Sequence, residues 1–170
     1  MAILFAEAHP DIELMGITTV YGNATIDNGT QNALYLKQKF GMKALVAKGS
    51  DKPLLRDPVG ATVVVHGETG LGDVTAPSSL DYEAIKKPAY QFIIDSVRAE
   101  PREITLVAVG PLTNLALALE AAPDIVDLVK EVVVMGGAFG ENGHRGNVTP
   151  FAEANIHDAV SYTHLTLPTT

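Results

Sequence analysis

Apolar runs of strand length alternate with helical patterns along this chain of 170 residues. Short runs rich in β-branched and other apolar side chains predict buried strands over residues 14–20, 44–47, 104–109 and 131–135. Apolar positions spaced three or four residues apart predict helices over residues 27–40, 82–99 and 112–120. Gly41 is a typical stop signal for the first of these helices, and the second would be amphipathic through Ile85, Phe92, Ile93 and Val97.

The order of these elements predicts an α/β fold. Alternating strands and helices place the strands in an open, mostly parallel sheet flanked by helices, and continuous apolar strands are typical of sheets covered on both faces. Ligands of such sheets bind beyond the carboxyl ends of the strands. The polar segments that follow the strands, residues 21–23, 110–114 and the stretch after Gly136 and Gly137, are therefore the first candidates for a site.

Composition narrows the class of protein. The chain is 46% hydrophobic and 19% charged, which allows a packed core and argues against disorder. Its formal net charge is −8 and its Lys and Arg are scattered, so no basic patch predicts nucleic-acid binding. It has no cysteine, no basic leader and no apolar run of the roughly 20 residues that a membrane span needs. We therefore expect a cytoplasmic protein without a nucleic-acid or membrane partner.

Both ends of the sequence depart from this alternation. Residues 1–8 have a helical pattern with no N-cap and no preceding strand, so we expect that a strand and its loop are missing there. Residues 160–170 are rich in Thr and Leu, lack a helical period and interrupt what should become a helix. We expect one domain over residues 1–158, truncated at both ends, followed by a non-native tail over residues 159–170 that looks like sequencing-adapter read-through.

The stretch GNVTPFAEANIHD, residues 146–158, concentrates hydrogen-bonding side chains. If it is extended, Glu153 and Asn155 point to the same side, because strand side chains alternate. Asn147 lies six residues before Glu153, ahead of a Thr-Pro turn. Carboxylate and carboxamide groups set out in this way can hold the vicinal hydroxyls of a sugar. The alternative is an ordinary polar loop.

Two further segments are candidates. His66 begins the glycine-rich stretch HGETGLG and is either a general acid, a ligand-binding group or a structural histidine. Residues 109–114 join a strand to a helix, where backbone amides can meet an anion or carbonyls a cation. The alternative is a plain connection with Pro111 near the helix start. The sequence lacks the phosphate- and dinucleotide-binding glycine motifs, the serine-hydrolase elbow and zinc-ligand spacings.

Five segments, taken in order, resemble the inosine–uridine-type nucleoside hydrolases, the nucleoside N-ribohydrolase family. They are GITTVYGN (residues 16–23), HGETGLG (66–72), LVAVGPLTN (106–114), VMGGA (134–138) and GNVTPFAEAN (146–155). Each segment alone is a weak signal, but their order and approximate spacing agree from Met1 to about Asp158.

The resemblance implies a Rossmann-like sheet and a chemistry. The family hydrolyses the N-glycosidic bond of ribonucleosides to ribose and a free base through an oxocarbenium-like transition state, which serves nucleoside catabolism and purine or pyrimidine salvage. It implies a bound calcium ion (Ca2+) that holds the ribose diol and the attacking water. It also implies a homodimer or homotetramer for the full-length protein.

Carried over by position, the resemblance implies roles for individual residues. Asn23 matches a pocket asparagine beside the metal, and Val109 matches the residue that offers calcium its backbone carbonyl. His66 matches a histidine near the nucleobase, so we expect it to bind substrate. The matches to residues that line and hydrogen-bond the ribose are Met135, Asn147, Glu153 and Asn155.

The family's defining acidic groups do not occur at the matching places. Its Asp-x-Asp-x-Gly-x-Asp-Asp motif, which supplies calcium ligands and the catalytic base, should directly precede Met1, and a late calcium-binding aspartate is also absent. We therefore assign no catalytic residue and expect the 170-residue chain to be inactive alone. The alternative function is a non-catalytic sugar- or nucleoside-binding α/β module. The preference for purine or pyrimidine bases and the acid that protonates the leaving base stay open.

Overall fold

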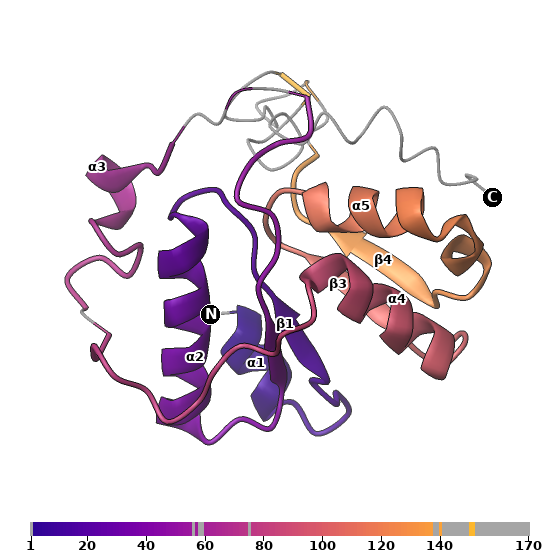
Figure 1. Cartoon of the computed structure of the whole chain (residues 1–170), viewed down its shortest axis with the longest axis horizontal. Coiled ribbons are helices and arrows are strands. Elements are labelled where there is room, and N and C mark those ends of the chain that lie inside the picture. The colour runs from indigo at the N-terminus through magenta and orange to yellow at the C-terminus, as the bar shows by residue number, and fades with distance from the viewer. Residues whose placement is uncertain are drawn as a thin grey trace.

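The computed structural model describes residues 2–55, 57, 60–74, 76–137, 140, 150 and 151. Its strands pair in parallel: β1 (Gly16–Thr18) with β2 (Leu45–Ala47), and β3 (Thr105–Ala108) with β4 (Glu131–Val134). Helices connect and flank these strands (Figure 1): α1 (Ala2–Ala8), α2 (Ile26–Phe40), α3 (Val63–His66), α4 (Ala89–Ala99), α5 (Thr113–Ala121) and the 3-10 helix η1 (Pro123–Asp127). The predicted α/β architecture with parallel strands is confirmed.

Helix α2 begins and ends where its capping residues dictate. The Thr25 side chain accepts a hydrogen bond from the Asn28 backbone N–H at 3.2 Å, which satisfies one of the unpaired amides of the first turn. At the other end Gly41 adopts a left-handed conformation with φ of 65°, and its N–H bonds to the Lys37 carbonyl. The stop predicted at Gly41 is confirmed, and the helix begins one residue before the predicted start.

The turn from α2 into β2 is held by a buried lysine. The Lys37 ammonium donates to three successive backbone carbonyls, those of Met42, Lys43 and Ala44, at 3.0, 3.1 and 2.7 Å. It also lies 4.9 Å from the centre of the Tyr82 ring. These contacts replace the water that the charge loses on burial.

The helix predicted over residues 82–99 is wrong in its first third. Helix α4 begins only at Ala89, with Pro88 as its N-cap at φ −65° and ψ 153°. Proline disfavours helical geometry in the residue before it, so an apolar period cannot carry a helix through this point. Ile85 is instead extended, donates its N–H to the Val46 carbonyl at 2.8 Å and pairs with Ala47 beside β2.

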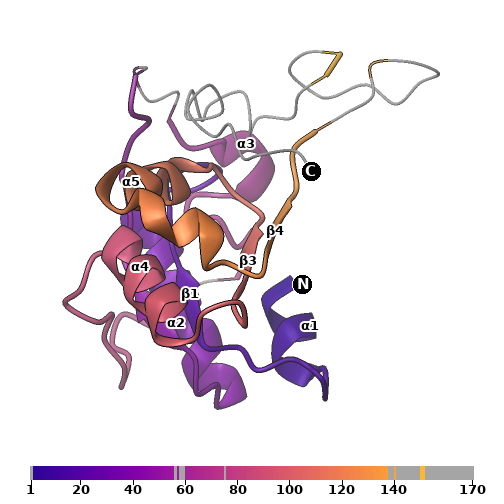
Figure 2. The ribbon, with the colours of Figure 1, turned by 90° about the vertical axis from the view of Figure 1, so that its right-hand side faces the viewer.

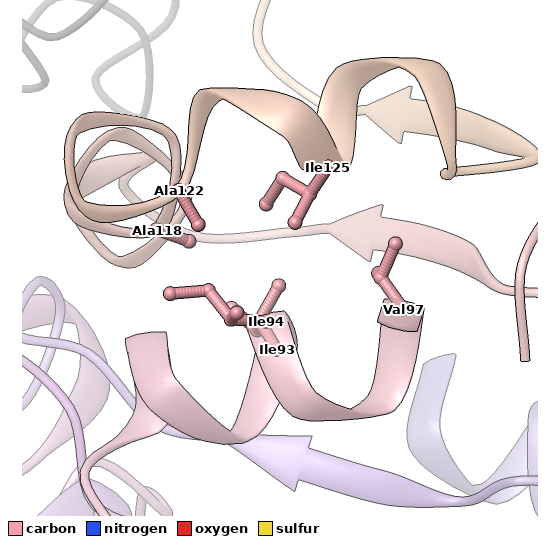
Figure 3. Close-up of a cluster of buried hydrophobic side chains, with 6 residues drawn as sticks. All are labelled: Ile93, Ile94, Val97, Ala118, Ala122 and Ile125. Carbon is pink, nitrogen blue, oxygen red and sulfur yellow. The ribbon is translucent and has the colours of Figure 1, made fainter. Parts of the chain in front are cut away.

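The larger apolar cluster lies between α4, α5 and η1. Figure 3 shows side chains of α4 pointing toward those of α5 and η1, and the buried members of this helix interface are Ile93, Ile94, Val97, Ala118, Ala122 and Ile125. Ile104 and Leu106 pack against it from β3 and its approach. A smaller cluster joins Ala33 and Leu34 of α2 to Val46 of β2.

The two faces of the β3–β4 ladder are covered differently. Figure 2 shows α4 and α5 on one side of these strands and α1 on the other. None of the described residues of α1 is buried, and Phe5 is 65% exposed. The helix predicted near the start of the chain is confirmed, but it is held by few contacts.

Candidate functional site

The carboxyl ends of β1, β2 and β3 are tied together by one side chain. Asn114, at the start of α5 and 5% exposed, donates from Nδ2 to the Thr19 carbonyl at 2.8 Å. Its Oδ1 accepts the Ser50 backbone N–H at 3.0 Å. Thr19 directly follows β1 and Ser50 lies just beyond β2, so Asn114 fixes both loops relative to the β3–α5 turn.

This arrangement requires a glycine at position 49. A Cβ added to Gly49 would lie 2.2 Å from the Thr19 carbonyl oxygen and 2.3 Å from Asn114 Oδ1. Both distances are too short for any real contact, so a side chain would push the two loops apart or break the Asn114 hydrogen bonds.

Buried hydroxyl groups reinforce the same edge. The Tyr21 hydroxyl and Thr113 Oγ1 lie 3.2 Å apart, which links the loop after β1 to the first residue of α5. Thr19 Oγ1 lies 2.9 Å from Thr30 Oγ1 of α2. Each buried hydroxyl therefore has a partner, as low-dielectric surroundings demand.

The glycine-rich stretch that begins at His66 docks on the start of α2. Asn28 Nδ2 donates to the Glu68 carbonyl at 2.9 Å, and Asn32 Nδ2 donates to the Thr69 carbonyl at 2.8 Å. A Cβ added to Gly70 would lie 2.6 Å from Ala24 Cβ, so this turn lies directly against the residue after Asn23. Two segments far apart in sequence are thus brought together at one edge.

Three of the predicted site residues lie at this edge in exposed positions. Asn23 is exposed in the bend between β1 and α2. Val109 directly follows β3 and is 54% exposed, and Met135 directly follows β4 and is 52% exposed. The Met135 N–H donates to the Ala108 carbonyl at 2.9 Å, which keeps the two strand ends adjacent.

His66 ends the short helix α3 and is half-buried. Its carbonyl accepts the Gly72 N–H at 2.8 Å, which closes the glycine-rich turn. The remaining predicted site residues, Asn147, Glu153 and Asn155, lie outside the described residues.

The supporting residues of this edge were missed by sequence reasoning. Residues 109–114 were singled out for their backbone, whereas the structure shows that the Asn114 side chain does the joining. Asn28 and Asn32 were read only as parts of a helix. Residue type could have pointed to these roles, because asparagine side chains at a helix end or on one helix face can donate to the free carbonyls of a glycine-rich turn.

The described residues do not make up a calcium site. Calcium takes six to eight oxygen ligands. In residues 2–55 and the other described ranges, no group of three or more His, Asp or Glu side chains could hold a metal ion. The Val109 carbonyl that the resemblance assigns to calcium would be one ligand only, so no catalytic step through the metal can be built from these residues.

Shifted pKa values in the described part of the chain occur on α4 and η1. The hydrogen bond that Arg98 donates to Asp124 lowers the pKa of that carboxyl, with Nε–Oδ2 and Nη2–Oδ1 distances of 2.9 and 2.6 Å. Hydrogen bonds from Lys87 and then Gln91 lower the pKa of Asp95. Since α4 ends at Ala99, just before the amino end of β3, the Arg98–Asp124 pair braces the helices at the end opposite to the candidate site.

Within the described residues, no helix is both long enough and apolar enough to cross a membrane.

Comparison with known proteins agrees with this picture. A family model described as inosine-uridine preferring nucleoside hydrolase matches residues 1–159. The chain is 44% identical over 158 residues to an inosine-uridine preferring nucleoside hydrolase of Leishmania major, covering 92% of this chain and 49% of that protein. It is 43% identical over 157 residues to the pyrimidine-specific ribonucleoside hydrolase RihB of an Escherichia coli strain, covering 92% and 48%.

A solved structure extends the likeness to the fold. The chain is similar to a purine-preferring ribonucleoside hydrolase from Gardnerella vaginalis with a TM-score of 0.84 and 36% identity, covering 93% of this chain and 50% of that one. The predicted Rossmann-like fold is therefore confirmed. The chain spans about half the length of the curated relatives it matches. On the family match over residues 1–159, the chain belongs to the inosine-uridine preferring nucleoside hydrolase family.

Proposed function

We propose that the full-length protein hydrolyses the N-glycosidic bond of ribonucleosides, releasing ribose and a free nucleobase. One observation carries this proposal: the family match extends over residues 1–159, and its described segments converge at the carboxyl ends of the strands. In open α/β sheets this is where ligands bind.

The chain's own residues supply the ribose-binding part of the proposed site. The exposed Asn23 carboxamide can both donate to and accept from a ribose hydroxyl, and Met135 would line the sugar. We propose Asn147, Glu153 and Asn155 as further ribose-binding residues. An acidic side chain such as Glu153 stabilises the positive charge that develops on the sugar ring as the glycosidic bond breaks.

His66 is proposed as a residue of the nucleobase side of the site. The turn that it begins lies against Ala24, next to Asn23, so sugar-side and base-side groups would be neighbours. The family relatives carry names that specify inosine and uridine, pyrimidine or purine substrates at comparable identity, so we propose no base preference for this protein.

Further properties of the full-length protein belong to the same proposal. We propose calcium as its cofactor, with the Val109 backbone carbonyl as one ligand and the other ligands from outside the described residues, because the described side chains do not form a metal site. We also propose a homodimeric or homotetrameric cytoplasmic enzyme of nucleoside catabolism and salvage. Residues 1–158 would form the native part of the chain and residues 159–170 a non-native tail.

Activity of a chimera tests the function. Residues 1–158 would be joined to those parts of the Leishmania major hydrolase that the match leaves uncovered, and release of free base from uridine and inosine would be measured. We expect turnover by the chimera and none by the 170-residue chain. Asn23→Ala in the chimera should lower kcat/KM by about 10- to 100-fold, the effect of one or two lost transition-state hydrogen bonds.

The control for this experiment is Glu83→Ala, which removes an exposed side chain before α4 and should leave kcat/KM unchanged. An inactive but folded chimera that binds ribose in calorimetry would support the alternative, a non-catalytic sugar-binding module. Turnover by the 170-residue chain alone would contradict the need for further segments.

A further inference from the structure

One face of α2 carries a row of carboxamide side chains that bind the backbone of a distant segment. Residues three or four positions apart are neighbours on a helix surface, and this spacing places the row on one side of α2. Each member hydrogen-bonds the main chain between α3 and α4, and Figure 1 shows that segment running beside α2. The members of the row are Asn28, Gln31, Asn32 and Gln38.

The two asparagines of the row bind the turn that begins at His66. We call residues 66–72 the His66 turn. Asn28 Nδ2 donates to the Glu68 carbonyl at 2.9 Å, and Asn32 Nδ2 donates to the Thr69 carbonyl at 2.8 Å. The asparagine pair therefore connects the middle of the His66 turn to the first two turns of α2.

The two glutamines of the row bind the same segment beyond the turn. Gln31 Nε2 donates to the Pro77 carbonyl at 3.0 Å. Gln38 Oε1 accepts the Asp81 N–H at 2.7 Å. Side chains of the same chemistry on the same helix face thus have two different targets, which provides matched controls for the asparagine pair.

The hydrogen bonds within the His66 turn close it but do not attach it to the rest of the chain. The Gly72 N–H donates to the His66 carbonyl at 2.8 Å, and the Gly70 N–H donates to the Gly67 carbonyl at 3.2 Å. The helix before the turn gives little hold, because the residues of α3 are exposed or half-buried and Val64 is fully exposed. The position of the turn therefore depends on its polar contacts with α2.

A glycine lets the His66 turn come into contact with the loop after β1. Gly70 has a φ of 82°, and a Cβ added to it would lie 2.6 Å from Ala24 Cβ. Ala24 directly follows Asn23, the residue proposed to bind ribose. The docked turn therefore fixes the separation between Asn23 and the histidine at its start.

We propose that Asn28 and Asn32 are positioning residues that hold His66 at a fixed distance from Asn23, and so set the span between the sugar side and the base side of the site. This inference rests on the proposed function. The amide donors of both asparagines are directed at the turn, so they act through His66 without touching the substrate. Loss of either hydrogen bond would let the turn move away from Ala24 while the sugar-side groups keep their places.

The nuclear Overhauser effect (NOE) between Gly70 Hα and the Ala24 methyl group tests the anchoring in the 170-residue chain. Asn32→Asp keeps the shape of the side chain but replaces its donor by an acceptor that faces a carbonyl. We expect this NOE to weaken and the Gly72 N–H to exchange about 3- to 10-fold faster at neutral pH, because the turn opens more often. The Ile85 N–H, paired with β2 in the same segment, should exchange at an unchanged rate.

Gln31→Glu is the matched control for this variant. It makes the same change of charge and also removes a donor from α2, but that donor binds Pro77 beyond the His66 turn. We expect the NOE and the exchange rate of Gly72 to stay as they are in the parent chain. A release of the turn by both variants would mean that any added charge on α2 is enough, and would overturn the specific role of the asparagines.

A pair of glycine variants tests the contact from the other side. Gly70→Ala places a Cβ against Ala24 and should release the turn as Asn32→Asp does. Gly60→Ala has the same strain of a left-handed backbone, with a φ of 83°, but nothing lies within 4 Å of its added Cβ. We expect no change in the exchange of Gly72 in this second variant.

A double-mutant cycle in the chimera of residues 1–158 tests whether the asparagine acts through His66. Asn32→Asp should lower kcat/KM by about 3- to 10-fold when His66 is present and by far less in the His66→Ala background. Gln31→Glu should leave kcat/KM unchanged in both backgrounds. Equal losses from Asn32→Asp in the two backgrounds would overturn the positioning role, because a general loss of structure does not depend on the histidine.

The two measurements separate this inference from the proposed function. An inactive chimera, together with release of the turn in Asn32→Asp, would reject the hydrolase activity and leave the anchoring in place. An unchanged NOE and unchanged exchange of Gly72 would overturn the inference whatever the chimera does. If Asn32→Asp unfolded the chain, seen as faster exchange of Ile85, Asn28→Asp would decide in its place, since a carboxylate is favourable in the first turn of a helix.

Discussion

The helix interface and the carboxyl edge, by which we mean the loops at the carboxyl ends of β1, β2 and β3, are held together by different interactions. The interface of α4 with α5 and η1 consists of aliphatic side chains such as Ile94 and Val97, each 2% exposed or less. The carboxyl edge is held by single donors and acceptors, above all those of Asn114. Apolar volume can be filled in several ways, whereas a hydrogen bond needs one group in one place. The interface therefore supplies stability, and the edge supplies the relative positions of the loops.

The largest effect is expected from a cavity in the helix interface. Ile94→Ala removes most of a side chain that is 2% exposed and should lower the free energy of unfolding by about 2–5 kcal/mol. Urea unfolding followed by circular dichroism measures the change. Val64→Ala, at a fully exposed position of α3, is the matched control and should stay within about 0.5 kcal/mol. Equal losses of unfolding free energy in the two variants would show that the helix interface does not supply more stability than an exposed position.

A smaller effect is expected from removing the side chain of Asn114, which connects the loops after β1 and β2. Asn114→Ala leaves the Thr19 carbonyl and the Ser50 N–H without this partner and should cost about 1–3 kcal/mol of unfolding free energy. Asn23→Ala removes the same group from an exposed position of the same edge and should leave the stability nearly unchanged. If both variants were equally stable, Asn114 would not be what holds the loops.

The hydroxyl pair at the edge should contribute less again. Tyr21→Phe and Thr113→Val each remove one hydroxyl of the pair and should cost about 0.5–1.5 kcal/mol. Since Tyr21 has further interactions, a double-mutant cycle is needed to isolate the pair. We expect the double variant to lose less stability than the sum of the single variants. Simple additivity would show that the two hydroxyls do not interact.

The smallest effect is expected from the exposed ion pair between Arg98 of α4 and Asp124 of η1. Because the pKa of Asp124 is lowered in the folded chain, its carboxylate adds to the free energy of unfolding above the ordinary titration range of aspartate. This stabilisation is lost as pH falls through the lowered pKa. Asp124→Asn should therefore lower Tm slightly near neutral pH, and its difference from the parent chain should shrink below about pH 4. Glu120→Gln, an exposed charge change on α5, controls for net charge. A difference that grew on acidification would contradict this sign.

Local patterns were enough to predict much of the fold. The apolar runs located the strands, and Gly41 marked the end of α2 because a left-handed residue is needed there. The helix start at Ala89 was missed because the apolar spacing continued across Ile85, which pairs with a strand. Helix α3 and the 3-10 helix η1 were also missed, since four or five residues are too few to establish a period.

The candidate site was only partly accessible to sequence reasoning. The rule that ligands meet the carboxyl ends of parallel strands singled out residues 21–23 and 110–114, whereas Asn23, Val109 and Met135 as site residues follow from the family resemblance. The role of Asn114 does not, because its partner Ser50 lies 64 residues away and such a pairing leaves no local pattern. The roles of Asn147, Glu153 and Asn155 stay predictions.

The short extended segment before α4 has a consequence for how molecules meet in concentrated solution. Ile85 donates its N–H to the Val46 carbonyl of β2, and Ala89 donates its N–H to the Lys48 carbonyl just beyond that strand, so the outer edge of β2 is already occupied within the molecule. The next residues are two exposed lysines and Pro88, which has no N–H to offer a further strand. Charge and proline at a sheet edge oppose the stacking of one molecule's strands on another's. This segment therefore leaves the outer edge of β2 poorly suited to pairing with a strand of another molecule.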